Sequence, residues 1–303
     1  MNVVILGQGA IGLLWYRALQ RLGGDKVNVK IFPSSAAPTA SKTFTFTCFS
    51  GSSEQRPLIT ADKMALTECD HLLVCVKSYQ VKQALVPLLP NLNTGSSIIL
   101  SHNGMGTLAE LPEEIIDKHA ILALLTTHGC LRIKPRHIRH TGRGFSDIGL
   151  VSGQLAVKQQ TELTGLLNLA LPQVEWTNNI VEKQWRKLAV NSVINPLTAL
   201  HQLKNGQILA DKFTAQITAI LTEVSQVAKS QGIELDLREL EQVVTGVAQA
   251  TSNNISSMRC DVLGGKKTEI DYISGYIHRL GVKEHLATPE NTRLWQQVST
   301  LLK

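Results

Sequence analysis

Three polar residues recur at four-residue intervals in one otherwise apolar stretch of the chain: Lys187, Asn191 and Asn195. In a helix this spacing stacks the three side chains on one face, one turn apart. A lysine ammonium beside two carboxamides suits the reduction of a 2-keto acid, because the ammonium polarises the carbonyl and then protonates the alkoxide left by hydride addition. Lys187 is therefore the candidate general acid. Most helical lysines only extend their charged end into water, and the two stacked asparagines are what distinguish Lys187 from that ordinary case.

A second group of residues begins at position 7 and reads GQGAIG, a GxGxxG pattern between an apolar run and an amphipathic segment. In that context the pattern predicts a dinucleotide site. The first glycine permits the tight turn, the second lets the backbone approach a pyrophosphate, and the third allows close packing of helix on strand. The helix N-terminus adds partial positive charge. The candidate cofactor-binding residues are Gly7, Gln8, Gly9, Ala10, Ile11 and Gly12.

The end of the second expected strand bears on the choice of cofactor. An NAD-selective enzyme usually has an acidic residue there, which binds the ribose 2′-hydroxyl. Residues 30–35 read KIFPSS and contain no acid, which favours NADP. They also lack the arginine that often holds a 2′-phosphate. Candidates for binding this phosphate are Ser34, Ser35 and Lys42.

The elements that must position these residues alternate between strand and helix in the first part of the chain. Short apolar runs predict buried parallel strands, and residues at helical spacing predict helices between them. The expected strands are 2–6, 27–32, 71–76 and 97–100, and the expected helical segments are 10–22, 79–89 and 105–118. This alternation predicts a Rossmann-type, doubly wound α/β sheet.

The remaining segments do not continue this alternation of strand and helix. We expect residues 33–60 to be irregular apart from one alternating run at 43–49, and residues 120–150 to extend the sheet with antiparallel strands. After residue 178 the apolar stripes have helical spacing throughout. With 303 residues, two domains are expected. We place them at 1–178, an NADP-binding Rossmann-type domain, and 179–303, an all-helical substrate and catalytic domain.

Composition limits the partners and the compartment. The net charge of +6 suits a phosphate-rich ligand. Basic residues between 128 and 143 raise the alternative of nucleic acid, but basic residues commonly protect sheet edges and no aromatic residues are interleaved for base stacking. We therefore expect no nucleic-acid partner, no membrane span and no metal. Five scattered cysteines without CxxC spacing, and no leader at the N-terminus, predict a cytoplasmic protein with reduced thiols.

Five fragments, spread in order over most of the chain, resemble the ketopantoate reductase family. They are HNGMG (102–106), WRKLAVNSVINPLTA (185–199), NISSM (254–258), TEIDYISGY (268–276) and PENTRL (289–294). The resemblance implies a Rossmann-type domain followed by an all-α domain like the C-terminal domain of 6-phosphogluconate dehydrogenase. It also implies NADPH as cofactor and the reduction of 2-dehydropantoate to (R)-pantoate, on the route to pantothenate and coenzyme A.

The resemblance also implies roles for individual residues. Lys187 is the implied catalytic acid, and Glu269 assists at the substrate and the cofactor. Asn103 is implied to lie near both the nicotinamide and the substrate, and Lys77 near the cofactor phosphates. The implied substrate-binding residues are Asn103, Asn191, Asn195, Asn254 and Ser257.

From spacing alone, by contrast, Glu269 is typical of an acid at a helix start, and Asn254 with Ser257 is typical of capping residues. Two other functions stay open: a reductase of another branched 2-keto acid, and a non-catalytic NADPH-binding regulatory protein. The expected partner is a small-molecule substrate, and the expected assembly is a monomer or homodimer.

Overall fold

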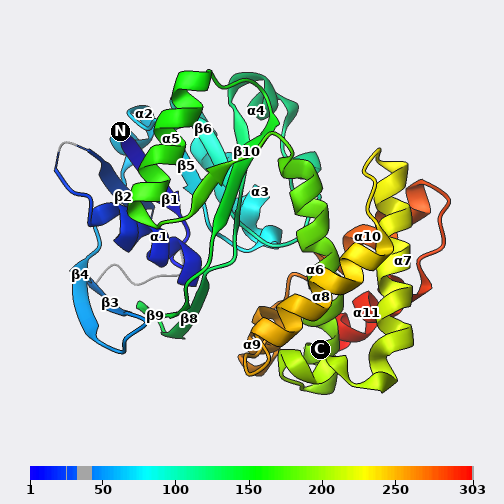
Figure 1. Cartoon of the computed structure of the whole chain (residues 1–303). Coiled ribbons are helices and arrows are strands. Elements are labelled where there is room, and N and C mark those ends of the chain that lie inside the picture. The colour runs from blue at the N-terminus through cyan, green and yellow to red at the C-terminus, as the bar shows by residue number, and fades with distance from the viewer. Residues whose placement is uncertain (25, 33–42, 302–303) are drawn as a thin grey trace. The chain divides into compact units, whose positions relative to one another are not determined.

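The computed structural model of the chain describes residues 1–24, 26–32 and 43–301. The candidate 2′-phosphate ligands Ser34, Ser35 and Lys42 lie outside the described residues. The chain forms two compact units (Figure 1): Met1–His102 with Ala109–Ile180, and Asn103–Leu108 with Val181–Lys303. The short segment 103–108 therefore packs with the second unit although it follows a strand of the first. The single division after residue 178 stays a prediction.

The first unit is built on a sheet that has seven strands within the described ranges, in the order β11-β10-β7-β6-β5-β1-β2. The five strands from β7 to β2 are parallel, whereas β10 runs antiparallel to β7. β5 and β6 are buried along their whole length, as expected for apolar strands covered on both faces. The strands are β1 Asn2–Leu6, β2 Asn28–Phe32, β5 His71–Val74, β6 Ser97–Leu100, β7 Ile121–Thr126, β10 Ser146–Ser152 and β11 Val174–Trp176.

Helices connect these strands and cover the sheet. α1 and α5 contact one another on one face (Figure 1). α1 buries Trp15 and Tyr16 completely in the core of this unit. The helices are α1 Ala10–Gln20, α2 Lys63–Thr67, α3 Val81–Leu85, α4 Glu113–Lys118 and α5 Val157–Ala170, with 3-10 turns η1 Ser78–Gln80, η2 Val86–Asn91 and η3 Leu108–Glu110.

A second, smaller sheet corrects two of the predictions. Residues 43–57, expected to be mostly irregular, form a hairpin of β3 Thr43–Thr47 and β4 Ser53–Pro57. Residues 129–142 form a second hairpin, β8 Gly129–Lys134 and β9 His137–Gly142, which pairs in parallel with β3 instead of extending the main sheet. Four consecutive exposed residues at the end of β8 explain this, because an inner strand of the main sheet would have to bury them.

The helix expected over 105–118 is present only in its last part, as α4. Residues 103–107 are irregular, and Gly104 and Gly106 have φ angles of +81° and +97°. Pro112 precedes the first residue of α4. Left-handed glycines and a proline both interrupt a helix, so the apolar spacing at 105–118 overstated its length.

The second unit is helical, which confirms the fold class predicted for this part. Its core is a cluster of buried aliphatic side chains that includes Trp185 and Ile277. The N-terminus of α11 is held by the buried carboxylate of Glu223, which accepts hydrogen bonds from the backbone N–H groups of Glu290 and Asn291 at 2.7 and 2.9 Å. The helices are α6 Ile180–His201, α7 Thr214–Ser230, α8 Leu237–Ala250, α9 Ser257–Leu263, α10 Ser274–Lys283 and α11 Pro289–Thr300, with 3-10 turns η4 Asn205–Leu209, η5 Asp211–Phe213 and η6 Ile270–Tyr272. Of the described helices, none combines the length and the apolar character that crossing a membrane requires.

Candidate active site

The glycine pattern forms a tight turn between β1 and α1. Gly7 has a φ angle of +117°, and a Cβ there would lie 2.7 Å from the carbonyl oxygen of Cys75. A Cβ on Gly12 would overlap the carbonyl oxygen of Gly7, so the first turn of the helix packs directly against the glycine turn. Gly9 differs, because the nearest atom to its Cβ position is 3.8 Å away. Two of the three glycines thus shape the turn, whereas a Cβ at Gly9 would make only an ordinary van der Waals contact.

Gly9 lies at the start of a helix whose N-terminus suits an anion. Gly9 is the N-cap of α1, no side chain caps the helix, and its first turn contains no acid. The first backbone N–H groups of a helix have no partner within it and attract negative charge. β1 and β5 are adjacent, with Cys75 N–H donating to Leu6 at 2.7 Å, so the chain leading to Lys77 leaves the sheet beside the turn. These residues fit the pyrophosphate of a dinucleotide.

The hairpin β8–β9 contacts α1. A histidine pair lies at this hairpin: His128 immediately precedes β8, and His140 lies in β9. The thiol of Cys130 is 3.4 Å from the carbonyl oxygen of Ala10, and burial raises the pKa of this thiol to about 12. His128 Nδ1 accepts a hydrogen bond from Gly144 N–H at 3.1 Å and lies 3.3 Å from His140 Nε2. Burial, with a smaller effect of His140, lowers the pKa of His128 to about 4. The His128 ring is therefore neutral at physiological pH.

Helix α6 carries three of the predicted substrate and catalytic residues of the second unit. Lys187, Asn191 and Asn195 lie on α6, whose continuous helix from Ile180 to His201 places them on one face at successive turns. Lys187 and Asn191 are half-buried, and Asn195 is 6% exposed. Asn191 Nδ2 is buried and has no hydrogen-bond partner among the residues described. A buried amide in that state is a donor for an oxygen of a bound ligand.

Asn103 and Glu269 meet in the same unit, although 166 positions separate them in the chain. Asn103 Nδ2 donates a hydrogen bond to Glu269 Oε2 at 3.3 Å, and the Glu269 side chain is only 4% exposed. The backbone continues the contact, because Met105 N–H donates to the carbonyl oxygen of Tyr272 at 2.8 Å. The close approach requires a glycine at 104, since a Cβ there would overlap that same oxygen.

Asn254 and Ser257 lie around the start of α9. The carbonyl oxygen of Asn254 accepts a hydrogen bond from Asn205 N–H at 3.0 Å. Ser256, between them, is the N-cap of α9, and its hydroxyl lies 2.7 Å from Thr198 Oγ1 on α6.

The structure thus groups the predicted residues in two sets, each within one unit. The glycine turn and Lys77 belong to the first unit, and the other predicted residues belong to the second. Sequence reasoning missed Tyr272 and Tyr276, which receive the segment 103–108, and Glu223, which holds α11. The glycines of the segment HNGMG were the available signal for the first of these contacts. Nothing in the helical stripe around Glu223 distinguished it from an exposed acid.

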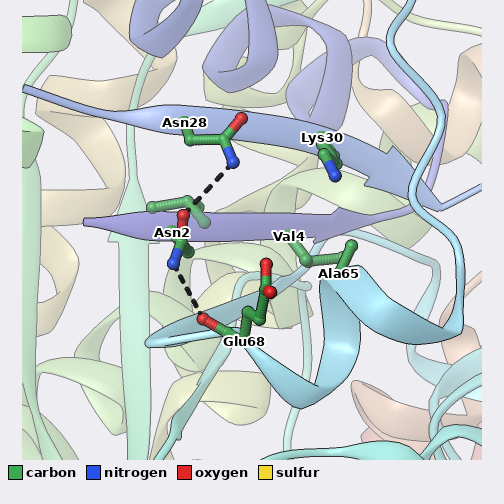
Figure 2. Close-up of a pocket in the computed structure, with 7 residues that line it drawn as sticks. Asn2, Val4, Asn28, Lys30, Ala65 and Glu68 are labelled. Carbon is green, nitrogen blue, oxygen red and sulfur yellow. Dashed lines mark hydrogen bonds between the residues drawn. The ribbon is translucent and has the colours of Figure 1, made fainter. Parts of the chain in front are cut away.

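Two hollows contain none of the predicted residues. One, of about 10 Å³, is lined by Asn2, Asn28, Lys30 and neighbouring side chains at the amino ends of β1 and β2. Figure 2 shows the hydrogen bonds from Asn28 to Asn2 and from Asn2 to Glu68 among the residues that line it. Space of this size holds about one water molecule, so the hollow is no ligand site. The other, of about 510 Å³, lies between Leu203 and Phe213 in the helical unit.

Comparison with known families matches both parts of the chain. Residues 3–153 match the family described as ketopantoate reductase PanE/ApbA, and residues 179–301 match ketopantoate reductase PanE/ApbA C terminal. The 2-dehydropantoate 2-reductase of Vibrio cholerae serotype O1 is 39% identical over 99% of this chain and 98% of that protein. The 2-dehydropantoate 2-reductase of Yersinia pestis is 36% identical over 98% of this chain and 94% of that protein.

Solved structures share the architecture. A ketopantoate reductase of the PanE/ApbA family from Ralstonia eutropha JMP134 superposes with a TM-score of 0.85 at 25% identity, over 100% of this chain and 98% of that one. A D-mandelate dehydrogenase with NADH and anilino(oxo)acetate has a TM-score of 0.87 at 20% identity, over the same shares. The second likeness shows the fold alone.

Proposed function

The chain belongs to the ketopantoate reductase family, and we propose that it catalyses the NADPH-dependent reduction of 2-dehydropantoate to (R)-pantoate, which leads to pantothenate and coenzyme A. The observation that carries this proposal is the 39% identity with the Vibrio cholerae enzyme across nearly the whole of both chains. We also propose the two domains 1–178 and 179–303, for cofactor and substrate respectively.

The first domain binds the cofactor through backbone and charge. The N–H groups at the start of α1, next to Gly9, receive the pyrophosphate, and Lys77 neutralises phosphate charge. No acid occupies the described end of β2, which supports NADPH over NADH. When bound, the nicotinamide supplies the hydride.

In the second domain, Lys187 is the general acid. Its ammonium polarises the C2 carbonyl of the keto acid and then gives a proton to the oxygen that has gained negative charge. Asn191 binds the substrate through the buried Nδ2 that has no partner among the described residues, and Asn195 lies one turn further along the same face. The other substrate-binding residues of the proposal are Asn254 and Ser257, next to the N-cap of α9.

Glu269 and Asn103 act together. The carboxylate of Glu269 accepts a hydrogen bond from the Asn103 amide N–H, which fixes the orientation of the amide group. Asn103 is thereby held in position for the substrate and the nicotinamide, and Glu269 for the substrate hydroxyl. Both residues belong to one compact unit.

The test follows NADPH oxidation at 340 nm with purified protein and 2-dehydropantoate. Lys187→Ala should lower kcat by about 10² to 10⁴-fold, the usual contribution of general acid catalysis. Lys229→Ala is the matched control, because Lys229 is 71% exposed at the end of α7 and should leave kcat unchanged. Loss of activity in both variants, or in neither, would contradict the role of Lys187.

Parallel assays separate the two alternatives. A higher kcat/KM for another branched 2-keto acid than for 2-dehydropantoate would show that this other acid is the substrate. The role of Lys187 in the reaction would stay the same. Tight NADPH binding without turnover of any keto acid would favour a regulatory protein. NADH in place of NADPH tests the cofactor preference.

The remaining proposals concern assembly and location. We propose a monomer or homodimer, which sedimentation equilibrium distinguishes. We propose a cytoplasmic location because the five cysteines are free thiols, the state that a reducing compartment maintains.

A further inference from the structure

Tyr276, on α10, contacts two segments that carry proposed site residues. On one side, Gly106 packs against its ring so closely that a Cβ on Gly106 would lie 2.8 Å from Tyr276 Cδ2. Gly106 is three residues after Asn103. On the other side, the ring of Trp185 on α6 lies 5.9 Å from the Tyr276 ring, centroid to centroid, at an interplanar angle of 53°. Trp185 is two residues before Lys187.

Trp185 is one of the buried side chains that fix the rotation of α6 about its own axis. Trp185 is 2% exposed and belongs to the core cluster of the helical unit, against which Tyr276 also packs. Residues two positions apart in a helix point about 200° from each other. An anchored Trp185 therefore helps to set the direction in which Lys187 leaves the helix.

A small rotation of α6 has a large effect on the ammonium. At a side-chain radius of about 5 to 6 Å, a rotation of about 10° moves the end of the side chain by roughly 1 Å. A misplacement of about 1 Å at a reacting group lowers a rate by up to about 10²-fold. Tyr276 is the ring between this helix and the segment that carries Asn103.

We propose that Tyr276 is a positioning residue for the reduction, which holds the Lys187 turn of α6 and the Asn103 segment in one fixed arrangement through its contacts with Trp185 and Gly106. The ring does not react and needs no contact with substrate. This inference rests on the proposed function. It adds a specific requirement, because one aromatic side chain must keep its contacts with both Gly106 and Trp185 for the general acid to be placed.

The decisive variants are Tyr276→Leu, which removes the ring, and Tyr276→Phe, which keeps it. The readout is the first-order rate constant for oxidation of bound NADPH in a single turnover, because it does not depend on the fraction of protein that is folded. Tyr276→Leu should lower this constant about 10- to 100-fold, and Tyr276→Phe should restore it to within about twofold of the parent. The Kd for NADPH, measured by fluorescence, should stay within about threefold.

Phe213→Leu is the matched control, since Phe213 is another buried ring of the helical unit, paired with His201 at 5.2 Å. Its single-turnover constant should match that of the parent. If Tyr276→Leu does not fold, Gly106→Ala displaces the same ring from its other side and should show the same loss.

An unchanged single-turnover constant in folded Tyr276→Leu, or in Gly106→Ala, would overturn this inference while the proposed function stands. An equal loss in Phe213→Leu would reduce it to a general effect of core packing. A parent protein that reduces no keto acid would overturn the proposed function and this inference with it.

Discussion

The glycine turn at 7–12 and the segment 103–108 are both places where a missing side chain lets backbone come close, but their partners differ. Gly12 presses on Gly7, five residues away, and both lie in one strand-turn-helix unit. Gly104 presses on Tyr272, and the neighbouring Asn103 bonds to Glu269, 166 residues away. The first arrangement is local and recognisable as a motif. The second exists only when the helical unit has folded around it.

The largest expected effect comes from breaking the local arrangement with Gly12→Ala. The new Cβ would overlap the carbonyl oxygen of Gly7, and neither backbone can withdraw without moving β1 or α1. We expect the free energy of unfolding to fall by about 4 kcal/mol, together with loss of NADPH binding. Urea denaturation and fluorescence titration measure the two effects.

Gly9→Ala is the matched control for Gly12→Ala. Because the nearest atom lies 3.8 Å from its Cβ position, stability should be nearly unchanged while NADPH affinity falls. Equal loss of stability in both variants would show that the turn is not held by the Gly7–Gly12 approach.

The corresponding change in the long-range arrangement is Gly104→Ala. It places a side chain at a φ angle of +81° and against the carbonyl oxygen of Tyr272. Strain and overlap together should lower the free energy of unfolding by about 3 kcal/mol. Here kcat should fall with little change in NADPH affinity, the reverse of Gly9→Ala. A variant that loses cofactor affinity but keeps kcat would contradict the separation of the two regions.

The same difference explains what the sequence predicted. The strands and the glycine turn were predictable because their signals, apolar runs and GxGxxG, lie within a few residues. The hairpin β8–β9 was assigned to the wrong sheet, since its parallel partner β3 is about 90 residues away. Spacing placed Lys187, Asn191 and Asn195 on one helix face, but the contact of Asn103 with Glu269 has no local signal. Only family resemblance put these two residues in one site.

A pH titration sharpens the comparison through a single group of the first unit, His128. The unfolded chain takes up a proton at a histidine near pH 6.5, whereas folded His128 stays neutral to about pH 4. The unfolded state therefore binds more protons in that window, and stability falls as pH drops through it. Between pH 7 and pH 5 this histidine should cost about 2 kcal/mol.

His128→Gln should flatten that pH dependence, as measured by urea denaturation at several pH values. His140, whose pKa is also lowered, chiefly by burial, adds to the parent slope and remains in the variant. A slope unchanged by His128→Gln would mean that another group dominates the acid response.

The contact between Asn103 and Glu269 is open to a double-mutant cycle. Each single variant, Asn103→Ala and Glu269→Ala, removes the same hydrogen bond, so their effects on kcat/KM should not multiply. We expect the double variant to be about tenfold more active than the product of the two single losses predicts, which corresponds to about 1.4 kcal/mol. Independent effects would place the two side chains in separate roles.

The smallest expected effect tests a glycine that has no such contact. Gly246 lies inside α8 and is exposed, and apart from its chain neighbours and the backbone of its own helix no atom of the described residues lies within 4 Å of its Cβ position. Alanine loses less backbone freedom on folding and forms helix more readily, so Gly246→Ala should raise the free energy of unfolding by about 0.5 to 1 kcal/mol. The single-turnover rate should not change. A lower free energy of unfolding in Gly246→Ala would show that the local contacts of a glycine do not predict the effect of adding a Cβ. The comparison of Gly246 with Gly12 and Gly104 would then fail.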